Sequence, residues 1–284
     1  MTELNKKTGF IGSGNMGEAF VGALIQTGIF SPSMIYITDI SDERLDFMHR
    51  TYGVRIMSDN AGLFSECDIV VLAVKPQQMD QVLSRIADQE GYDISERKLV
   101  ISIAAGITIG KIESLLYPGL DESVRKKLPI IRVMPNTPAL VLAGMSGMSA
   151  NSYAKDEDIT ITKTILEAMG KVIVFEEEKL DAVTGLSGSG PAYVFYMIES
   201  MTEAGIRLGM APDDAATLTL ATIEGAIRLM KERNESPESL RRKVTSPGGT
   251  TEAALKVMEK KGFKECMIEA IAAAAERSKE LSGG

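Results

Sequence analysis

Residues 9–17 read GFIGSGNMG, a G-x-G-x-x-G pattern that lies between a short apolar run and a segment, residues 15–27, with apolar residues at helical spacing. In such a strand–turn–helix unit, Gly12 allows a tight turn and Gly14 leaves room for a pyrophosphate, while Gly17 lets the helix lie close to the strand. The N–H groups that are free at the start of the helix suit phosphate oxygens. The stretch therefore predicts a dinucleotide-binding unit, with Ser13, Asn15 and Met16 as further cofactor contacts.

An acidic residue follows at the distance that this type of unit requires. Asp39 lies 22 residues after Gly17, at the end of a second apolar run. A carboxylate there binds the ribose 2′-hydroxyl and repels a 2′-phosphate, which favours NADH. Ser41 and Arg44 lie just beyond and could bind that phosphate if Asp39 turned away, and Asp39 could instead cap the helix that starts near Asp42. The sequence therefore leaves both NADH and NADPH open as the cofactor.

Outward from this unit, the first part of the chain alternates between strand-like and helix-like segments. This alternation predicts an α/β fold, an N-terminal Rossmann-type doubly wound, mostly parallel sheet with helices on its faces. The predicted strands are residues 8–12, 34–39, 54–57, 69–74, 99–104, 130–134 and 172–175, and the predicted helices are residues 15–27, 42–52, 77–87 and 156–169.

The pattern changes near Glu176, beyond which no strand is predicted. Helical spacing is found at residues 191–208, 212–232, 237–243, 250–260 and 263–281. Pro191, Pro212 and Pro237 suit the first turns of their helices. The expected organisation is a dinucleotide-binding Rossmann domain at residues 1–177, followed by an all-helical domain at residues 178–284.

Composition excludes several classes of function. The 284 residues are 44% hydrophobic and 25% charged, with a formal net charge of −8. A nucleic-acid or membrane-surface partner would need a basic face, so neither is expected. Two cysteines and one histidine give no zinc spacing, so no metal is expected. The start of the chain has no apolar signal region, and we expect a cytoplasmic protein.

Three loops follow the later predicted strands. They are AVKP at residues 73–76, AAG at residues 104–106 and MPNTP at residues 134–138. Ligands of doubly wound sheets bind outside the carboxyl ends of the strands, and small residues such as Ala73 and Val74 let a flat nicotinamide approach the backbone. Lys75 and Asn136 can donate hydrogen bonds there. The alternative is ordinary turn chemistry, in which Pro and Asn are common.

Two motifs rich in Ser, Thr and Gly stand out in the helical part. TGLSGSGP occupies residues 184–191 and TSPGGTTE occupies residues 245–252. Each presents backbone N–H groups and hydroxyls at the start of a helix, where a carboxylate or phosphate can bind. The alternative for the second motif is helix capping alone, with Thr250 or Thr251 as the N-cap.

With these motifs, the sequence resembles the pyrroline-5-carboxylate reductases over nearly its whole length. The resemblance lies in GFIGSGNMG, AVKP, AAGIT at residues 104–108, MPNTP, DAVTGLSGSGPAY at residues 181–193 and VTSPGGTTEAAL at residues 244–255. It implies hydride transfer from NADPH or NADH to the C=N bond of pyrroline-5-carboxylate, which yields proline. It also implies that the helical domain binds substrate and forms a homodimer, with a decamer as a further assembly.

The resemblance also assigns individual residues. It implies that Ser246, Gly249, Thr250 and Thr251 hold the substrate carboxylate, with Thr251 near the ring nitrogen as a catalytic residue. Asn60 looks like the family's ribose-contacting asparagine, and Ala105 like its nicotinamide contact. Lys75 is a second catalytic candidate, as a fixed positive charge or proton donor, or else a solvated lysine at a strand end.

Two rival functions fit part of the pattern. A hydroxyisobutyrate-type dehydrogenase shares the glycine turn and a helical second domain, but it should carry a catalytic lysine in the first long helix of that domain. Residues 191–205 contain no lysine. A nucleotide sensor without catalysis would have no need of the intact motif at residues 245–251.

Overall fold

The computed structural model describes residues 4–89 and 92–283, and its internal contacts divide the chain into two compact units. The first unit comprises Met1–Ser189 together with Ala274–Gly284, and the second comprises Gly190–Ala273. These units are defined by contact, whereas a domain is a part that folds on its own. The predicted domain boundary at residue 177 therefore remains a prediction.

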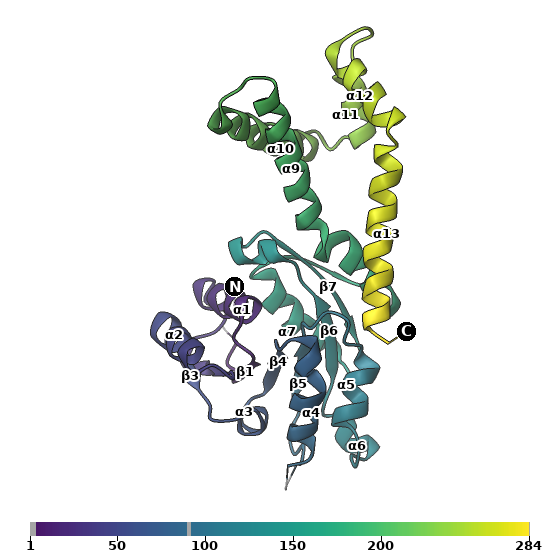
Figure 1. Ribbon diagram of the computed structural model, residues 1–284. Helices are drawn as coiled ribbons and strands as arrows, with labels where there is room; N and C mark the ends of the chain where they lie inside the picture. Colours follow the sequence, from purple (N-terminus) through teal and green to yellow (C-terminus); the bar gives the residue numbers. More distant parts are fainter. Residues whose placement is uncertain (1–3, 90–91, 284) are drawn as a thin grey trace. The chain divides into compact units, whose positions relative to one another are not determined.

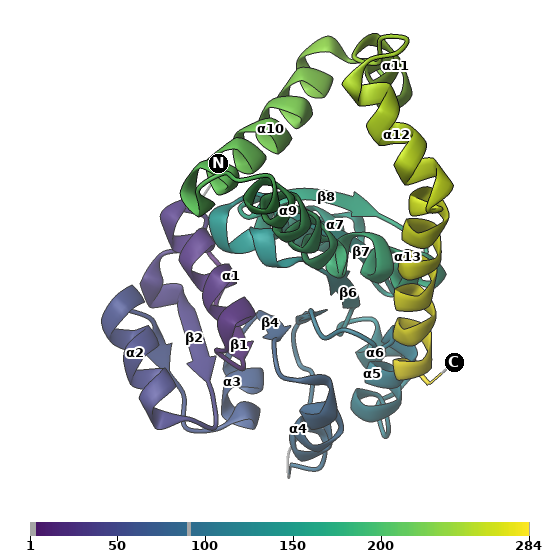
Figure 2. The same ribbon diagram turned by 45° about the horizontal axis from the view of Figure 1, so that its top comes forward.

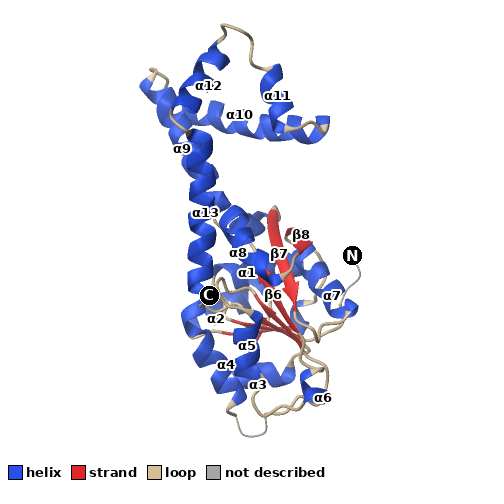
Figure 3. Cartoon of the chain, turned by 90° about the vertical axis from the view of Figure 1, so that its right-hand side faces the viewer, coloured by secondary structure: helices blue, strands red, loops and turns tan. Residues whose placement is uncertain are grey.

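Within the described residues, the first unit is built on one eight-stranded sheet, drawn as red arrows in Figure 3. The order across the sheet is β3-β2-β1-β4-β5-β6-β7-β8. The strands are β1 (Thr8–Ile11), β2 (Ile35–Thr38), β3 (Arg55–Ile56), β4 (Ile69–Leu72), β5 (Leu99–Ser102), β6 (Ile130–Met134), β7 (Gly144–Ala150) and β8 (Gly170–Val174).

The strand β7 was not predicted from the sequence. It runs antiparallel to β6, with Ser149 opposite Arg132, and parallel to β8, with Met148 opposite Val174. The remaining neighbours pair in parallel, so the sheet is mostly parallel, as predicted. The sequence of β7, GMSGMSA, has no β-branched or aromatic residue, and this explains why its strand character was missed.

Helices cover both faces of the sheet (Figure 1, Figure 2). On one face the core includes side chains of α1 (Asn15–Gln26), α2 (Asp42–Tyr52) and α7 (Asp156–Glu167). On the other it includes side chains of α3 (Asn60–Glu66), α4 (Met79–Ala87) and α5 (Ile109–Leu116). The helices α3, α5 and the short α6 (Glu122–Arg125) were not predicted from the sequence.

The central strands alternate between these two cores. Phe10 of β1 packs in the first core and Ile11 in the second. In β4, Ile69 and Val71 face the first core, whereas Val70 and Leu72 face the second. Burying each such side chain contributes about 1.5–3 kcal/mol, so a strand covered on both faces must be apolar throughout.

The order of the strands fixes where a ligand can bind. The strand β1 lies between β2 and β4. The strands β2 and β3 extend the sheet in one direction from β1, and β4 and the later strands extend it in the other direction. A crevice forms at such a switch point, outside the carboxyl ends of the strands. The turn after β1 and the residues that follow β2 and β4 meet at this edge.

Short helical turns complete the first unit. They are η1 (Pro32–Met34), η2 (Pro76–Gln78), η3 (Thr137–Val141), η4 (Glu177–Lys179), α8 (Leu180–Val183) and the π-helix η5 (Thr184–Gly188).

The second unit is helical, as predicted. Its helices are α9 (Gly190–Arg207), α10 (Pro212–Arg233), α11 (Pro237–Lys243), α12 (Thr250–Lys260) and α13 (Phe263–Leu281), the last of which has residues in both units. Pro212 and Pro237 open their helices, and Gly209 and Gly262 follow helix ends with φ of +94° and +68°. A Cβ on Gly205 would lie 2.9 Å from the Cβ of Ala215, so this glycine allows α9 and α10 to approach closely.

Candidate functional site

The turn from β1 into α1 has the geometry that its glycines predict. Gly12 has a φ of +95°, in the left-handed region, and a Cβ on Gly17 would lie only 2.6 Å from the carbonyl oxygen of Gly12. A Cβ on Gly14, by contrast, would meet no heavy atom of the described residues within 4 Å. Gly14 is also the N-cap of α1 and provides no side-chain cap, so the first N–H groups of the helix are available. This open backbone fits a pyrophosphate.

Asp39 is fixed beside this turn. Its Oδ2 accepts hydrogen bonds from the Ser13 N–H at 2.7 Å and the Ser13 hydroxyl at 3.0 Å, and its Oδ1 accepts one from the Ser41 N–H at 3.1 Å. The helix α2 is capped by Ser41, whose hydroxyl accepts a hydrogen bond from the Arg44 N–H. The suggestion that Asp39 caps α2 is therefore wrong.

Arg44 is held by neighbours on α1. Its Nε donates to the carbonyl oxygen of Ser13 at 2.5 Å, and its guanidinium forms an ion pair with Glu18. Glu18 also accepts a hydrogen bond from the Tyr52 hydroxyl at 2.9 Å. Burial, and then this hydrogen bond, raise the pKa of Tyr52 above its ordinary value. The phenol therefore stays a donor to Glu18.

Asn60 lies at the start of α3, where it faces the end of β2. Its Oδ1 accepts a hydrogen bond from the Thr38 hydroxyl at 2.7 Å. The preceding residue, Asp59, caps α3 by accepting a hydrogen bond from the Gly62 N–H at 2.7 Å. The Gly62 N–H, followed by the Ser58 hydroxyl, holds the pKa of Asp59 below its usual 3.8. The cap fixes the start of α3 and so the position of Asn60.

A cavity of about 770 Å³ opens over this edge of the sheet. The residues predicted to bind cofactor that line it are Gly12, Gly14, Asp39, Asn60, Ala73, Val74 and Lys75. Five predicted contacts, Ser13, Asn15, Met16, Gly17 and Ala105, are not among its lining residues, nor is Asn136. Other lining residues were not predicted from the sequence: Ile11, Thr38, Ile40, Ser58, Asp59, Ala61, Gln78, Gln81, Val82, Arg85 and Gln89. Gln78, Gln81, Val82, Arg85 and Gln89 lie in or next to α4, and their spacing puts them on one face of the helix, a pattern that could have suggested them.

Asn136 holds two segments of the first unit together. Its Nδ2 donates to the carbonyl oxygen and the hydroxyl of Ser187, both at 3.3 Å, and its Oδ1 accepts from the Met145 N–H at 2.8 Å. Ser187 belongs to the π-helix, a feature often found at functional sites, where a Ser/Gly loop was predicted. In this structure the Asn136 amide therefore supports the π-helix, and its role as a cofactor ligand remains a prediction.

A buried arginine braces the same end of the sheet. Arg132 of β6 is 4% exposed and pairs with Glu177 at 3.1 Å and with Asp181 at 3.6 Å. Glu177 also accepts the Ile109 N–H at 2.7 Å, and Asp181 accepts the Ser278 hydroxyl at 2.7 Å. This cluster ties β6, the start of α5 and the end of α13 together.

The loop before α12 contains the predicted substrate residues. Its helix starts at Thr250 with Gly249 as the N-cap and no side-chain cap, so capping by Thr250 or Thr251 is not observed. Gly248 has a φ of +74°, and its N–H donates to Glu252, which also pairs with Lys256. The loop therefore presents backbone N–H groups and the hydroxyls of Ser246, Thr250 and Thr251 at a helix start. This arrangement can accept a carboxylate.

Two negative findings concern the described residues alone. No group of three or more His, Cys, Asp or Glu side chains among them could hold a metal ion. None of their helices combines the length and the apolar character needed to cross a membrane.

Comparison with known proteins gives matches to both parts of the chain. Residues 7–106 match the family described as NADP oxidoreductase, coenzyme F420-dependent, and residues 177–281 match the family described as pyrroline-5-carboxylate reductase dimerisation. The pyrroline-5-carboxylate reductase 2 of Bacillus subtilis is 41% identical over 281 residues, which cover 97% of this chain and 95% of that protein.

Solved structures agree with these matches. A pyrroline-5-carboxylate reductase from Coxiella burnetii superimposes with a TM-score of 0.86 at 40% identity, covering 98% of this chain and 99% of the other. A Plasmodium falciparum pyrroline carboxylate reductase with NADP bound gives a TM-score of 0.85 at 32% identity, covering 99% and 100% of the two chains.

Proposed function

This chain belongs to the pyrroline-5-carboxylate reductase family, and we propose that it reduces the C=N bond of 1-pyrroline-5-carboxylate to L-proline, the last step of proline biosynthesis. The observation that carries the proposal is the presence, in one chain, of both a glycine turn open at Gly14 and the uncapped hydroxyl-rich loop before α12. The first suits a dinucleotide and the second suits a small carboxylate. Identity to the Bacillus subtilis enzyme along the whole chain supports the same reading.

The first unit supplies the cofactor site. Reduced nicotinamide supplies the hydride when it is bound. Gly12, Gly14 and the start of α1 hold the pyrophosphate, and Asp39 and Asn60 hold the adenosine ribose. Ala73, Val74 and Lys75 line the same cavity, where the small side chains of Ala73 and Val74 and the backbone suit a flat ring. Ser13, Asn15, Met16, Gly17, Ala105 and Asn136 remain proposed contacts of the cofactor.

The loop of the second unit supplies the substrate site. The hydroxyls of Ser246 and Thr250 and the N–H groups of Gly249 and Thr250 hold the substrate carboxylate, and the Thr251 hydroxyl orients the ring nitrogen. A cyclic imine takes a proton from water near neutral pH, so the protein needs no strong acid. Lys75, exposed at the end of β4, is a proposed source of positive charge. The main contribution of the protein is to position two reactants, worth up to about 7–11 kcal/mol in well-oriented cases.

Thr251 provides the direct test. We expect Thr251→Val to lower kcat/KM for pyrroline-5-carboxylate by about 10- to 100-fold, the effect of losing one hydrogen bond to a charged group, while the Kd for the reduced cofactor is unchanged. Thr251→Ser should keep most of the activity because it keeps the hydroxyl. Thr245→Val is the matched control, since the Thr245 hydroxyl already donates to the carbonyl oxygen of Arg241 at 2.6 Å. Full activity in Thr251→Val would remove Thr251 from the site.

The same assay separates this function from its rivals. The chain should oxidise NADH or NADPH with pyrroline-5-carboxylate and not with a 3-oxo acid, the expected substrate of a hydroxyisobutyrate-type dehydrogenase. The absence of lysine along α9 (Gly190–Arg207) agrees with that expectation. A nucleotide sensor would bind the cofactor and oxidise it with neither substrate.

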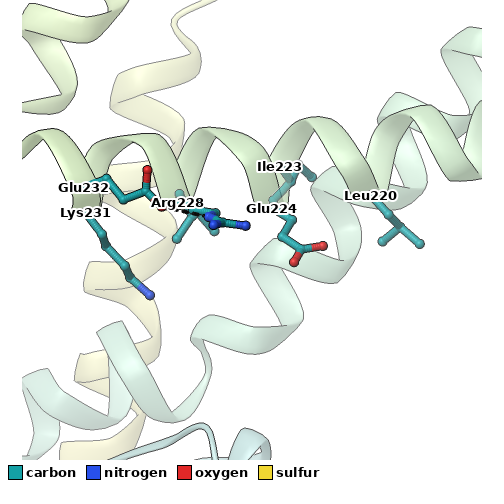
Figure 4. Close-up of a pocket in the computed structure, with 7 residues that line it drawn as sticks. Leu220, Ile223, Glu224, Arg228, Lys231 and Glu232 are labelled. Carbon is teal, nitrogen blue, oxygen red and sulfur yellow. Dashed lines mark hydrogen bonds and ion pairs between the residues drawn. The ribbon is translucent and has the colours of Figure 1, made fainter.

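The proposal also covers the oligomeric state of the protein and its location in the cell. The helix α10 carries a groove of about 770 Å³ that is lined by the apolar side chains of Leu220, Ile223 and Ile227 and by the charged side chains of Glu224, Arg228, Lys231 and Glu232 (Figure 4). The match of residues 177–281 to a dimerisation family supports self-association. We propose a homodimer that assembles further into a decamer, in the cytoplasm.

A further inference from the structure

Asp39 has one acceptor position left at the cavity. A carboxylate offers about four lone-pair sites on its two oxygens. Oδ2 accepts two hydrogen bonds from Ser13, and Oδ1 accepts one from Ser41. Because Asp39 lines the cavity, the remaining site on Oδ1 suits a hydroxyl donor such as a ribose 2′-OH.

The nearby cation is already engaged. Arg44, which could bind a 2′-phosphate, donates Nε to the carbonyl oxygen of Ser13 and pairs with Glu18 through its guanidinium. Its guanidinium carbon also lies 5.0 Å from the centre of the Phe47 ring. Both partners of the ion pair are only about one quarter exposed, with side-chain exposures of 24% and 25%. Turning Arg44 toward a phosphate would leave Glu18 partly buried without its cation.

Two other cations line the cavity, and both lie away from the end of β2. Lys75 follows β4, which is two strands from β2 and therefore about 10 Å away at ordinary strand spacing. Arg85 lies on α4, which follows β4 in the chain, and among the described residues no hydrogen bond or ion pair joins it to Asp39. Neither cation takes the place of Arg44 at Asp39.

We propose that this chain prefers NADH over NADPH because the Asp39 carboxylate faces the 2′ position while Glu18 keeps Arg44 away from it. The inference rests on the proposed function, since it names the cofactor of that same reductase. A 2′-phosphate would bring a second negative charge to Asp39 and would remove the hydroxyl that donates to it. We expect NADH to bind about 10- to 100-fold more tightly than NADPH.

Direct binding tests the proposal without turnover. The Kd of each reduced cofactor is measured on the full chain by isothermal titration calorimetry, at one pH and one salt concentration. Asp39→Ser should weaken the binding of NADH and tighten the binding of NADPH. The Kd for NADPH divided by the Kd for NADH should therefore fall to about one or below. Asp39→Glu keeps the carboxylate and should keep the preference for NADH. A loss of structure alone would weaken both cofactors by the same factor and leave the ratio unchanged.

A second variant tests the role of Arg44. Glu18→Gln removes the charge that holds the guanidinium, so NADPH should bind more tightly while NADH changes little. Asp46→Asn is the matched control, because Asp46 is an exposed acid on α2, the helix of Arg44, where it pairs with Arg50 and does not line the cavity. It should leave both Kd values unchanged.

The outcomes separate this inference from the proposed function. Equal or tighter binding of NADPH by the unchanged chain would overturn the NADH preference and leave the reductase function standing. A Kd ratio unaltered in an Asp39→Ser variant that unfolds in urea like the unchanged chain would also overturn it. Failure of both cofactors to bind would overturn the inference together with the function.

Discussion

The two units bury their apolar side chains to very different extents. In the first unit, large side chains such as Phe10, Phe20 and Leu24 are fully buried between the sheet and its helices. Within Gly190–Ala273, all of which is described, the buried side chains are Ala215 and Thr219, while Phe195, Tyr196 and Leu208 are 64%, 72% and 82% exposed.

This difference shows which part of the chain can complete its own core. A sheet covered by helices on both faces encloses its core within one chain, and the first unit has such a core on each face of its sheet. The helices of the second unit leave apolar surface exposed, and large exposed apolar patches mark interaction surfaces. Self-association, supported by the dimerisation family that residues 177–281 match, explains this surface.

One large expected effect concerns the exposed apolar face of the second unit. Ile227 is 45% exposed and lines the α10 groove drawn in Figure 4. We expect Ile227→Asp to weaken self-association by about 100-fold or more, because an unpaired charge would be buried in an apolar contact. Sedimentation equilibrium of the variant and the unchanged chain measures the effect.

Ile56→Asp is the control for this change, since Ile56 is a similarly exposed isoleucine, at 41%, in the first unit. It should leave the molecular mass unchanged. If Ile227→Asp sedimented like the unchanged chain at micromolar concentration, the α10 groove would not be part of the interface, and the contrast between the units would need another cause.

One ion pair from each unit shows the same contrast in burial. Arg132 is buried between Glu177 and Asp181, so Arg132→Met should leave two carboxylates without their cation and lower the free energy of unfolding by about 3–5 kcal/mol. In the second unit, Arg207 is 77% exposed and pairs with Glu203 one helical turn away, so Arg207→Met should change stability little. Urea unfolding at equal protein concentrations compares the two. A similar decrease in the free energy of unfolding in both variants would show that burial does not decide how much these ion pairs stabilise the chain.

Features set by neighbours in the sequence were predictable from it. The glycine turn, the helices of the second unit and the apolar strand β4 follow from local spacing and from the conformations that glycine allows. The antiparallel strand β7 was missed because GMSGMSA carries little strand propensity and is defined by its pairing with β6 and β8.

Features set by distant contacts were not predictable. Asn136 and Ser187 are 51 residues apart, and Arg132 meets Glu177 across 45 residues, so no local pattern reveals either contact. In the cofactor site, Asp39 was found from its spacing to Gly17. The engagement of Arg44 by Glu18, on which the NADH preference depends, became visible only once α1 and α2 were packed side by side.

The two cysteines also differ in burial, and this difference predicts a smaller effect, a dependence of stability on pH. Cys67 is buried in the first unit, and burial raises the pKa of its thiol from 9.0 to about 12. Between these two values the native chain keeps a proton that the unfolded chain has lost. The free energy of unfolding therefore falls as the pH rises above 9, by up to about 1.4 kcal/mol per pH unit.

The variant Cys67→Ala should remove this dependence, so that between pH 9 and pH 10.5 it loses about 1–2 kcal/mol less stability than the unchanged chain. Burial lowers the pKa of the neighbouring Lys98, which acts in the opposite direction as the pH rises, and because Lys98 and Cys67 interact electrostatically the difference between the two proteins includes this coupling. Cys266 is exposed in the second unit, so Cys266→Ala is the control and should follow the unchanged chain. Urea unfolding at a series of pH values measures both variants. If Cys67→Ala and Cys266→Ala lost stability equally as the pH rose, burial of the Cys67 thiol would not contribute to the loss of stability at alkaline pH.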